Sequence, residues 1–114
     1  MYHAEAVARV QASAFNAHDM DTFLNQYATR ARVLRDGHWV GEGRSAVQRG
    51  MEAEYHEGSY VQVRHLDGEP VLAECHGDPE HPDYEGVIRL HHVGDFVDEV
   101  RIDHDPGMLV RLQE

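Results

Sequence analysis

Four extended segments in the second half of the chain, and the short breaks between them, restrict the fold more than any other feature. The segments are residues 60–66, 70–76, 86–93 and 96–103. Asp67-Gly68 and Gly94-Asp95 separate the first and last pairs, and such residues suit two-residue hairpin loops because they accept positive φ. Several segments are apolar on both faces in places, which indicates a sheet covered on both sides, by helices on one face and by a partner subunit on the other.

The first half of the chain predicts helices around one further hairpin. Residues 3–17 carry apolar side chains at helical spacing, and Asp19 is a suitable N-cap for a second helix with Phe23, Leu24, Tyr27 and Ala28 on one face. Asp36-Gly37 predicts a hairpin turn within residues 32–40. Ser45 and Gln48 match a capping box for a third helix that we expect to end near Glu57. Asp105-Pro106 predicts the start of a short C-terminal helix.

Composition limits the classes of protein that this chain can represent. Its 114 residues predict one domain, residues 1–114, with a single core. The net charge of −11 argues against nucleic acid and anionic membranes as partners, since both select basic surfaces. A lone cysteine, Cys75, allows no intrachain disulfide, and no segment resembles a signal peptide or a membrane span. We therefore expect a cytoplasmic protein.

Residues 74–86, ECHGDPEHPDYEG, concentrate metal-ligand side chains in a short stretch. Cys75 and His76 are adjacent, so on a strand they point to opposite faces, and the prolines that follow are typical of a loop. Zinc sites favour short, closed ligand spacings, which this stretch does not offer. We interpret it as a hairpin loop and expect neither a metal ion nor an organic cofactor.

Residues 14–37 resemble the opening of nuclear transport factor 2-like proteins. The match to a helix followed by x-x-x-D-x-x-x-x-x-x-x-Y-A-x-x-A-x-V is carried by Asp19, Tyr27, Ala28, Ala31 and Val33. Gly43 and the following RSAVQ resemble that family's G-x-x-x-I entry to its third helix. The C-terminal strands extend the likeness over nearly the whole chain.

This resemblance implies a cone-shaped α+β barrel, in which N-terminal helices pack on a curved antiparallel sheet around an apolar pocket. Such proteins commonly form homodimers through the outer face of the sheet. Members include ketosteroid isomerases, SnoaL-like polyketide cyclases and pocket proteins without known activity. The fold supports many chemistries, so function has to be argued from the site.

Two family chemistries do not fit the residues. Ketosteroid isomerases use an Asp base with a Tyr and a protonated Asp. Rough alignment places Arg35 or Asp36 at the position of the base, Gln11 near that of the Tyr and Arg89 near that of the protonated Asp. Only Asp36 could serve, and the hairpin turn explains an Asp there equally well. The epoxide hydrolases of the fold use an Arg-x-Asp arrangement with a second acid. Arg101-Ile102-Asp103 has that spacing, but no second acid is identifiable, so a surface ion pair is the better interpretation.

Histidines are the remaining candidates for chemistry. His91 shares one strand face with Arg89, so His91 could act as a base and Arg89 could stabilise negative charge on a substrate. His92 lies on the other face, and His104 follows the last strand. The competing interpretation is that these residues are structural or lie in an interface. A metal on adjacent His91 and His92 is disfavoured because their side chains diverge.

Aromatic and flexible apolar side chains suggest the walls of a pocket: Phe15, Trp39, Met51 and Tyr55. Plain core is the better interpretation of Phe15 and Met51, whereas the place of Trp39, where the hairpin returns toward the third helix, favours the pocket. We therefore hypothesise a pocket protein that binds a small apolar molecule. One alternative is a cofactor-independent SnoaL-like enzyme that uses His91 and Arg89. Another is a dimeric protein-interaction module.

Overall fold

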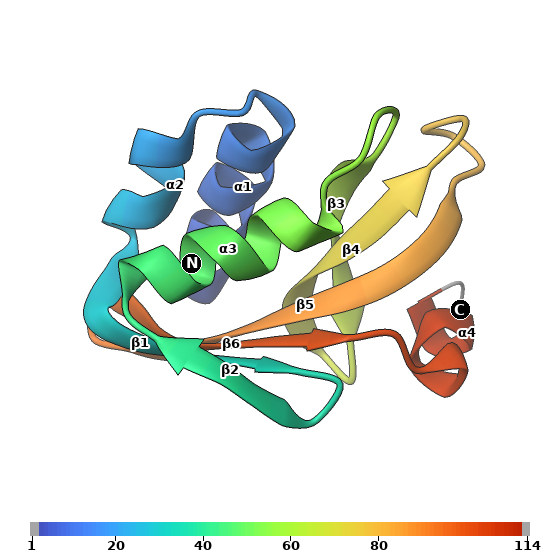
Figure 1. Cartoon of the computed structure of the whole chain (residues 1–114). Helices are drawn as coiled ribbons and strands as arrows, with labels where there is room; N and C mark the ends of the chain where they lie inside the picture. The colour runs from blue at the N-terminus through green and yellow to red at the C-terminus, as the bar shows by residue number, and fades with distance from the viewer. Residues whose placement is uncertain (1–2, 113–114) are drawn as a thin grey trace.

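The computed structural model describes residues 3–112, in which helices cover both faces of a curved six-stranded sheet (Figure 1). Helices α1, α2 and α3 lie over the concave face, and α4 packs on the opposite face. The elements in chain order are α1 (His3–Asn16), α2 (Met20–Asn25), β1 (Tyr27–Arg35), β2 (His38–Glu42), α3 (Arg44–Glu54), β3 (Tyr60–Leu66), β4 (Glu69–His76), β5 (Asp83–Val93), β6 (Phe96–Asp103) and α4 (Pro106–Leu112). The predicted α+β architecture is confirmed, including the short C-terminal helix.

The sheet has the strand order β2-β1-β6-β5-β4-β3. All neighbouring strands are antiparallel except β1 and β6, which are parallel, so the sheet is mixed and not wholly antiparallel as predicted. Val33 of β1 lies opposite Val100 of β6, and both are buried. This pairing joins the first hairpin to the last one and places β6 near the centre of the sheet.

The predicted hairpin turns form as the sequence indicates. Asp36 and Gly37 have φ of 51° and 82°, and Asp67 and Gly68 have φ of 54° and 83°. Positive φ at both central residues is what a type I′ hairpin turn requires, and Asp and Gly tolerate it better than most residues. The turn also exposes the Asp36 carboxylate beyond the end of β1, where it contacts the candidate site.

The second helix is shorter than predicted. It ends at Asn25, and Tyr27 and Ala28 begin β1 instead of completing a helical face. Tyr27 is fully buried and pairs with Val97 of β6, while the Val97 amide donates to the Gln26 carbonyl at 2.8 Å. A long-range strand pairing therefore overrides the local helical pattern.

The third helix also differs from the prediction at both ends. Gly43 is its N-cap, with φ of 96° and no side-chain cap, so the predicted capping box does not form. The helix ends at Glu54, because Tyr55 is extended and leads toward β3. The early stop leaves Glu54 at the end of α3, facing the sheet.

Two apolar clusters hold the layers together. The larger lies on the concave face and packs the helices against Val61, Leu72, Ile88 and Ile102. The smaller packs α4 against the opposite face, chiefly through Leu112. No helix within residues 3–112 is long and apolar enough to cross a membrane.

Candidate functional site

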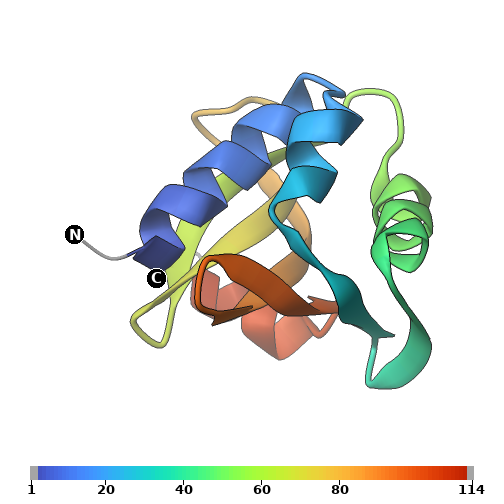
Figure 2. The ribbon, with the colours of Figure 1, turned by 90° about the vertical axis from the view of Figure 1, so that its left-hand side faces the viewer.

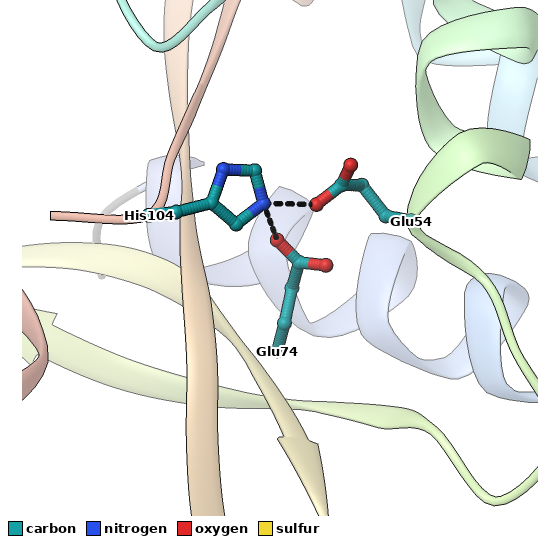
Figure 3. Close-up of side chains that lie close together, drawn as sticks. All are labelled: Glu54, Glu74 and His104. Atoms are coloured by element: carbon teal, nitrogen blue, oxygen red, sulfur yellow. Dashed lines mark hydrogen bonds and ion pairs between the residues drawn. The ribbon is translucent and has the colours of Figure 1, made fainter.

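Three ionisable side chains from separate elements meet on the concave side of the sheet (Figure 3). Glu54 ends α3, Glu74 lies on β4, and His104 directly follows β6. Nε2 of His104 lies 2.6 Å from Oε1 of Glu54 and 3.9 Å from Oε1 of Glu74. The two glutamate side chains are only 2% and 7% exposed, whereas the imidazole is 32% exposed. The cluster is therefore buried on its carboxyl side and reaches solvent through the histidine.

The alternation of β4 directs Glu74 into this interior. Leu72 belongs to the concave core, whereas Ala73 and Cys75 belong to the cluster beneath α4, so Glu74 shares the concave face with Leu72. Gly86 on β5 lies opposite Glu74. A Cβ at position 86 would collide with Oε1 of Glu74 and lie 3.2 Å from the Asp103 carbonyl oxygen. A glycine at this position therefore makes room for the buried carboxyl group.

Glu74 has the most perturbed environment in the cluster. Its Oε1 is buried and accepts no hydrogen bond from the described residues. Burial is the main cause that raises the pKa of Glu74, to about 9, and the hydrogen bond and negative charge of Glu54 add to it. Desolvation disfavours the charged form of a carboxyl group, so Glu74 holds a proton at neutral pH and can donate it.

Glu54 is surrounded by positive groups. Nη2 of Arg35 lies 2.5 Å from Oε2 of Glu54, and His104 occupies the other carboxyl oxygen at 2.6 Å. Arg35 is on β1, so this contact ties the end of α3 to the sheet. A short contact between an imidazole nitrogen and a carboxyl oxygen requires a proton between them.

Asp36 fixes the orientation of His104. It accepts hydrogen bonds from the backbone amide of His104 at 3.0 Å and from Nδ1 at 2.9 and 3.0 Å. Burial lowers the pKa of His104, but the bonds to Asp36 and Glu54 outweigh burial and leave that pKa raised. The hydrogen bond to His104 in turn lowers the pKa of Asp36. With Nδ1 held by Asp36, Nε2 is the ring nitrogen that faces the two glutamates.

The ligand atoms of Glu54, Glu74 and His104 lie within 4.8 Å of one another, a spacing that could also hold a divalent cation. The charge balance of the cluster favours a proton on Glu74 over a bound divalent cation. Arg35 and a protonated His104 already balance the carboxylates of Glu54 and Asp36, and a proton neutralises Glu74. The Glu54–Glu74–His104 cluster is therefore best suited to donating and accepting protons at the buried concave face of the sheet.

The histidine and arginine singled out from the sequence lie elsewhere. Arg89 donates from Nη2 to Asp103 at 2.6 Å, and Nδ1 of His91 lies 2.6 Å from Asp98. The His91 side chain is 64% exposed. The two residues share a strand face as predicted, but that face is opposite to the one that carries the Glu54–Glu74–His104 cluster.

Three of the four predicted pocket residues belong to or contact the concave core, whereas Trp39 is exposed. Phe15 and Met51 are buried in the concave core, and Trp39 on β2 is 58% exposed. Tyr55 follows Glu54 and stacks edge-on against Phe15 and His18, with ring centroids 5.9 and 3.8 Å away. Of the four, Tyr55 is the nearest in sequence to the cluster, and the role of all four as pocket walls stays a prediction.

Sequence reasoning missed both glutamates of the cluster. Residues 77–82 form a loop, but Glu74, Cys75 and His76 belong to β4, and β5 begins at Asp83. Cys75 is buried, and His76 pairs with Glu85 and Asp83. The sequence did contain one indication of Glu74: it lies two residues after Leu72, so on a strand the two share a face, which marks Glu74 as an inward carboxyl group.

Comparisons with known proteins agree on the fold. No family model and no curated protein matches this sequence. Solved structures do match: one provisionally named a ketosteroid isomerase, from Kribbella flavida, has a TM-score of 0.67 and 20% identity over 90% of this chain and 78% of that one. An NTF-2 like protein of unknown function from Burkholderia xenovorans has a TM-score of 0.64 and 17% identity over 88% and 80%.

A third structure, provisionally named a polyketide cyclase, from Sinorhizobium meliloti, has a TM-score of 0.60 and 16% identity over 85% and 93%. The chain thus has the nuclear transport factor 2-like fold, as its resemblance predicted. At these identities the likeness shows the fold alone, so the chemistry depends on the residues of this chain.

Proposed function

We propose that this chain is a cofactor-independent enzyme that moves protons on a small carbonyl-bearing molecule, with Glu74 as proton donor and His104 as proton acceptor. The observation that carries the proposal is a buried carboxyl oxygen of Glu74 that accepts no hydrogen bond within residues 3–112 and lies 3.9 Å from an imidazole that Asp36 orients. Acid and base assignments follow from pairs of groups whose environments separate their pKa values. Glu74 and the His104–Asp36 pair form such a combination.

In this reaction Glu74 donates its proton to the carbonyl oxygen of the substrate. Nε2 of His104 first passes its own proton to the Glu54 carboxylate, 2.6 Å away. The neutral imidazole then accepts the proton that leaves the carbon next to the carbonyl, and an enol results. In a conjugated enol, His104 returns its proton to the far carbon while the hydroxyl proton goes back to Glu74, which gives an isomer. Alternatively, the enol carbon attacks a second carbonyl and closes a ring, the hydroxyl proton goes back to Glu74, and His104 protonates the new alkoxide. His104 and Asp36 are partly exposed, so they connect the buried acid to solvent protons.

Asp36 and Arg35 act as positioning residues. Asp36 keeps Nδ1 protonated and turns Nε2 toward the glutamates. Arg35 holds Glu54 beside the imidazole. The names of two similar structures, an isomerase and a cyclase, match the class of proton transfer proposed here, although they show only the fold.

The test is exchange of α-protons in D₂O, followed by NMR, on a panel of cyclic ketones and β-keto esters. We expect the protein to accelerate exchange for at least one compound. Glu74→Gln and His104→Gln should abolish the acceleration, while His91→Ala should keep it. Loss of acceleration in His91→Ala alone would support the alternative in which His91 and Arg89 are catalytic. Loss on chelation, with recovery on adding Zn²⁺, would show that the cluster works with a cation.

The homodimer expected from the resemblance stays a prediction. Native mass spectrometry on the same samples gives the oligomeric state and any bound small molecule together.

A further inference from the structure

The sheet divides at one end into two separate hairpins. Strands β4 and β5 pair from His76–Asp83 to Leu72–Ile88, and no pairing continues beyond that point. The β3–β4 ladder nevertheless extends to Leu66–Glu69, and the β5–β6 ladder to Val93–Phe96. The turns that close the two hairpins lie apart in both views (Figure 1, Figure 2).

A cavity of about 460 Å³ occupies this division. Leu66, Val71 and Leu90 contribute apolar walls, Ala4 at the start of α1 contacts it, and Arg89 and His91 lie along β5. Its volume is within the range of roughly 300–1,000 Å³ that small-molecule sites occupy. None of the residues of the Glu54–Glu74–His104 cluster lines it, so it is a second site.

Arg89 supplies the polar anchor of this cavity. Its Nη2 is bound to Asp103 at 2.6 Å, but its Nε is buried and donates to no acceptor among the described residues. A buried donor without an acceptor destabilises the fold, and more so when it is charged. The Arg89 side chain as a whole is 39% exposed, so a carboxylate in the cavity could form a charge-assisted hydrogen bond with the guanidinium, which is stronger than a neutral one.

We propose that this cavity binds a small apolar molecule bearing a carboxylate, with the carboxylate on the partly exposed guanidinium of Arg89 and the apolar body on Leu66, Val71 and Leu90. Arg89, His91 and Arg111 also line this cavity, together with the carboxylates of Asp67 and Glu69. Arg111 pairs with Asp67, and His91 pairs with Asp98. Of the three basic side chains, Arg89 is therefore the one with a hydrogen-bond donor still to be satisfied within residues 3–112. Binding here is independent of the proton transfer proposed above.

The probe is octanoate, with 1-octanol as the uncharged control, and binding is followed by amide chemical shifts. We expect octanoate to shift residues of the cavity and to bind more tightly than 1-octanol. Arg89→Gln should weaken octanoate binding by about tenfold, since it removes a charge-assisted bond. Arg101→Gln is the matched control: Arg101 lies opposite Arg89 on β6, pairs with Glu99 and does not line the cavity.

A second variant, at an exposed position, tests the cavity without removing the Arg89–Asp103 ion pair. Glu69 is exposed and lines the cavity, so Glu69→Gln should bind octanoate at least as tightly as the parent protein. The proposal is overturned if octanoate does not bind at millimolar concentration. Equal losses from Arg89→Gln and Arg101→Gln, or binding that disappears in Glu74→Gln, would also overturn it.

Discussion

Glu74→Gln should make the protein more stable at neutral pH, because it removes a carboxyl group that folding forces to keep its proton. The pKa of Glu74 is raised from 4.5 to about 9 by burial and by Glu54. Between these two values the unfolded chain releases the proton and the folded chain retains it. The free energy of unfolding therefore falls as pH rises, by about 1.4 kcal/mol per pH unit.

From pH 4.5 to pH 7 this linkage amounts to a penalty of up to about 3 kcal/mol. Gln is similar in size and its amide can donate to Glu54, so it keeps the contact without the ionisation. Urea unfolding at a series of pH values should show the variant gaining stability over the parent from pH 4.5 upward, with no gain below it. Glu69→Gln on the exposed part of the same strand removes the same charge and should stay within about 0.5 kcal/mol at every pH. A difference between Glu74→Gln and the parent that does not depend on pH would refute the reasoning.

Three further predictions concern the surroundings of the site. Asp36→Asn keeps a residue that tolerates the positive φ of the turn but removes the negative partner of His104. The pKa of His104 should therefore fall in an NMR titration, and an unchanged titration midpoint would count against the role of Asp36. Gly86→Ala should lower the free energy of unfolding by about 1–3 kcal/mol because its Cβ meets the side chain of Glu74. The loss of stability should be clearly smaller in a Glu74→Ala background, and equal losses of stability in both backgrounds would exclude this contact as the cause. Tyr27→Phe removes the buried hydroxyl that donates to Oε1 of Gln11 at 2.6 Å and should cost about 1–3 kcal/mol in urea unfolding, whereas a neutral result would mean that water replaces the hydroxyl.

The features that the sequence predicted correctly are the local ones. Asp36-Gly37 and Asp67-Gly68 form hairpin turns because positive φ depends on the residues themselves. Asp19 caps α2 for a similar reason, since its carboxylate accepts a hydrogen bond from the Thr22 amide, three positions later in the same segment. Such signals need no partner from elsewhere in the chain.

The features that were missed depend on distant partners. Tyr27 leaves the helical pattern because it pairs with Val97, about seventy residues along the chain. Glu54 and Glu74 meet His104 only when α3 stops early and β4 takes the register that turns Glu74 inward. The alternation of β4 marks Glu74 as an inward carboxyl group only in the correct register, and no local pattern could identify Glu54 and His104 as its neighbours.

The most direct test of the account is the protonation state of Glu74. Carbon-13 NMR of protein labelled at the glutamate side-chain carboxyl carbons follows every Glu through a pH titration. One carboxyl resonance should titrate well above neutral pH, near the pKa of about 9 expected for Glu74, and this resonance should be absent from Glu74→Gln. If every glutamate in the protein ionises below pH 6, Glu74 is not a proton donor at neutral pH and the proposed chemistry of the cluster is wrong.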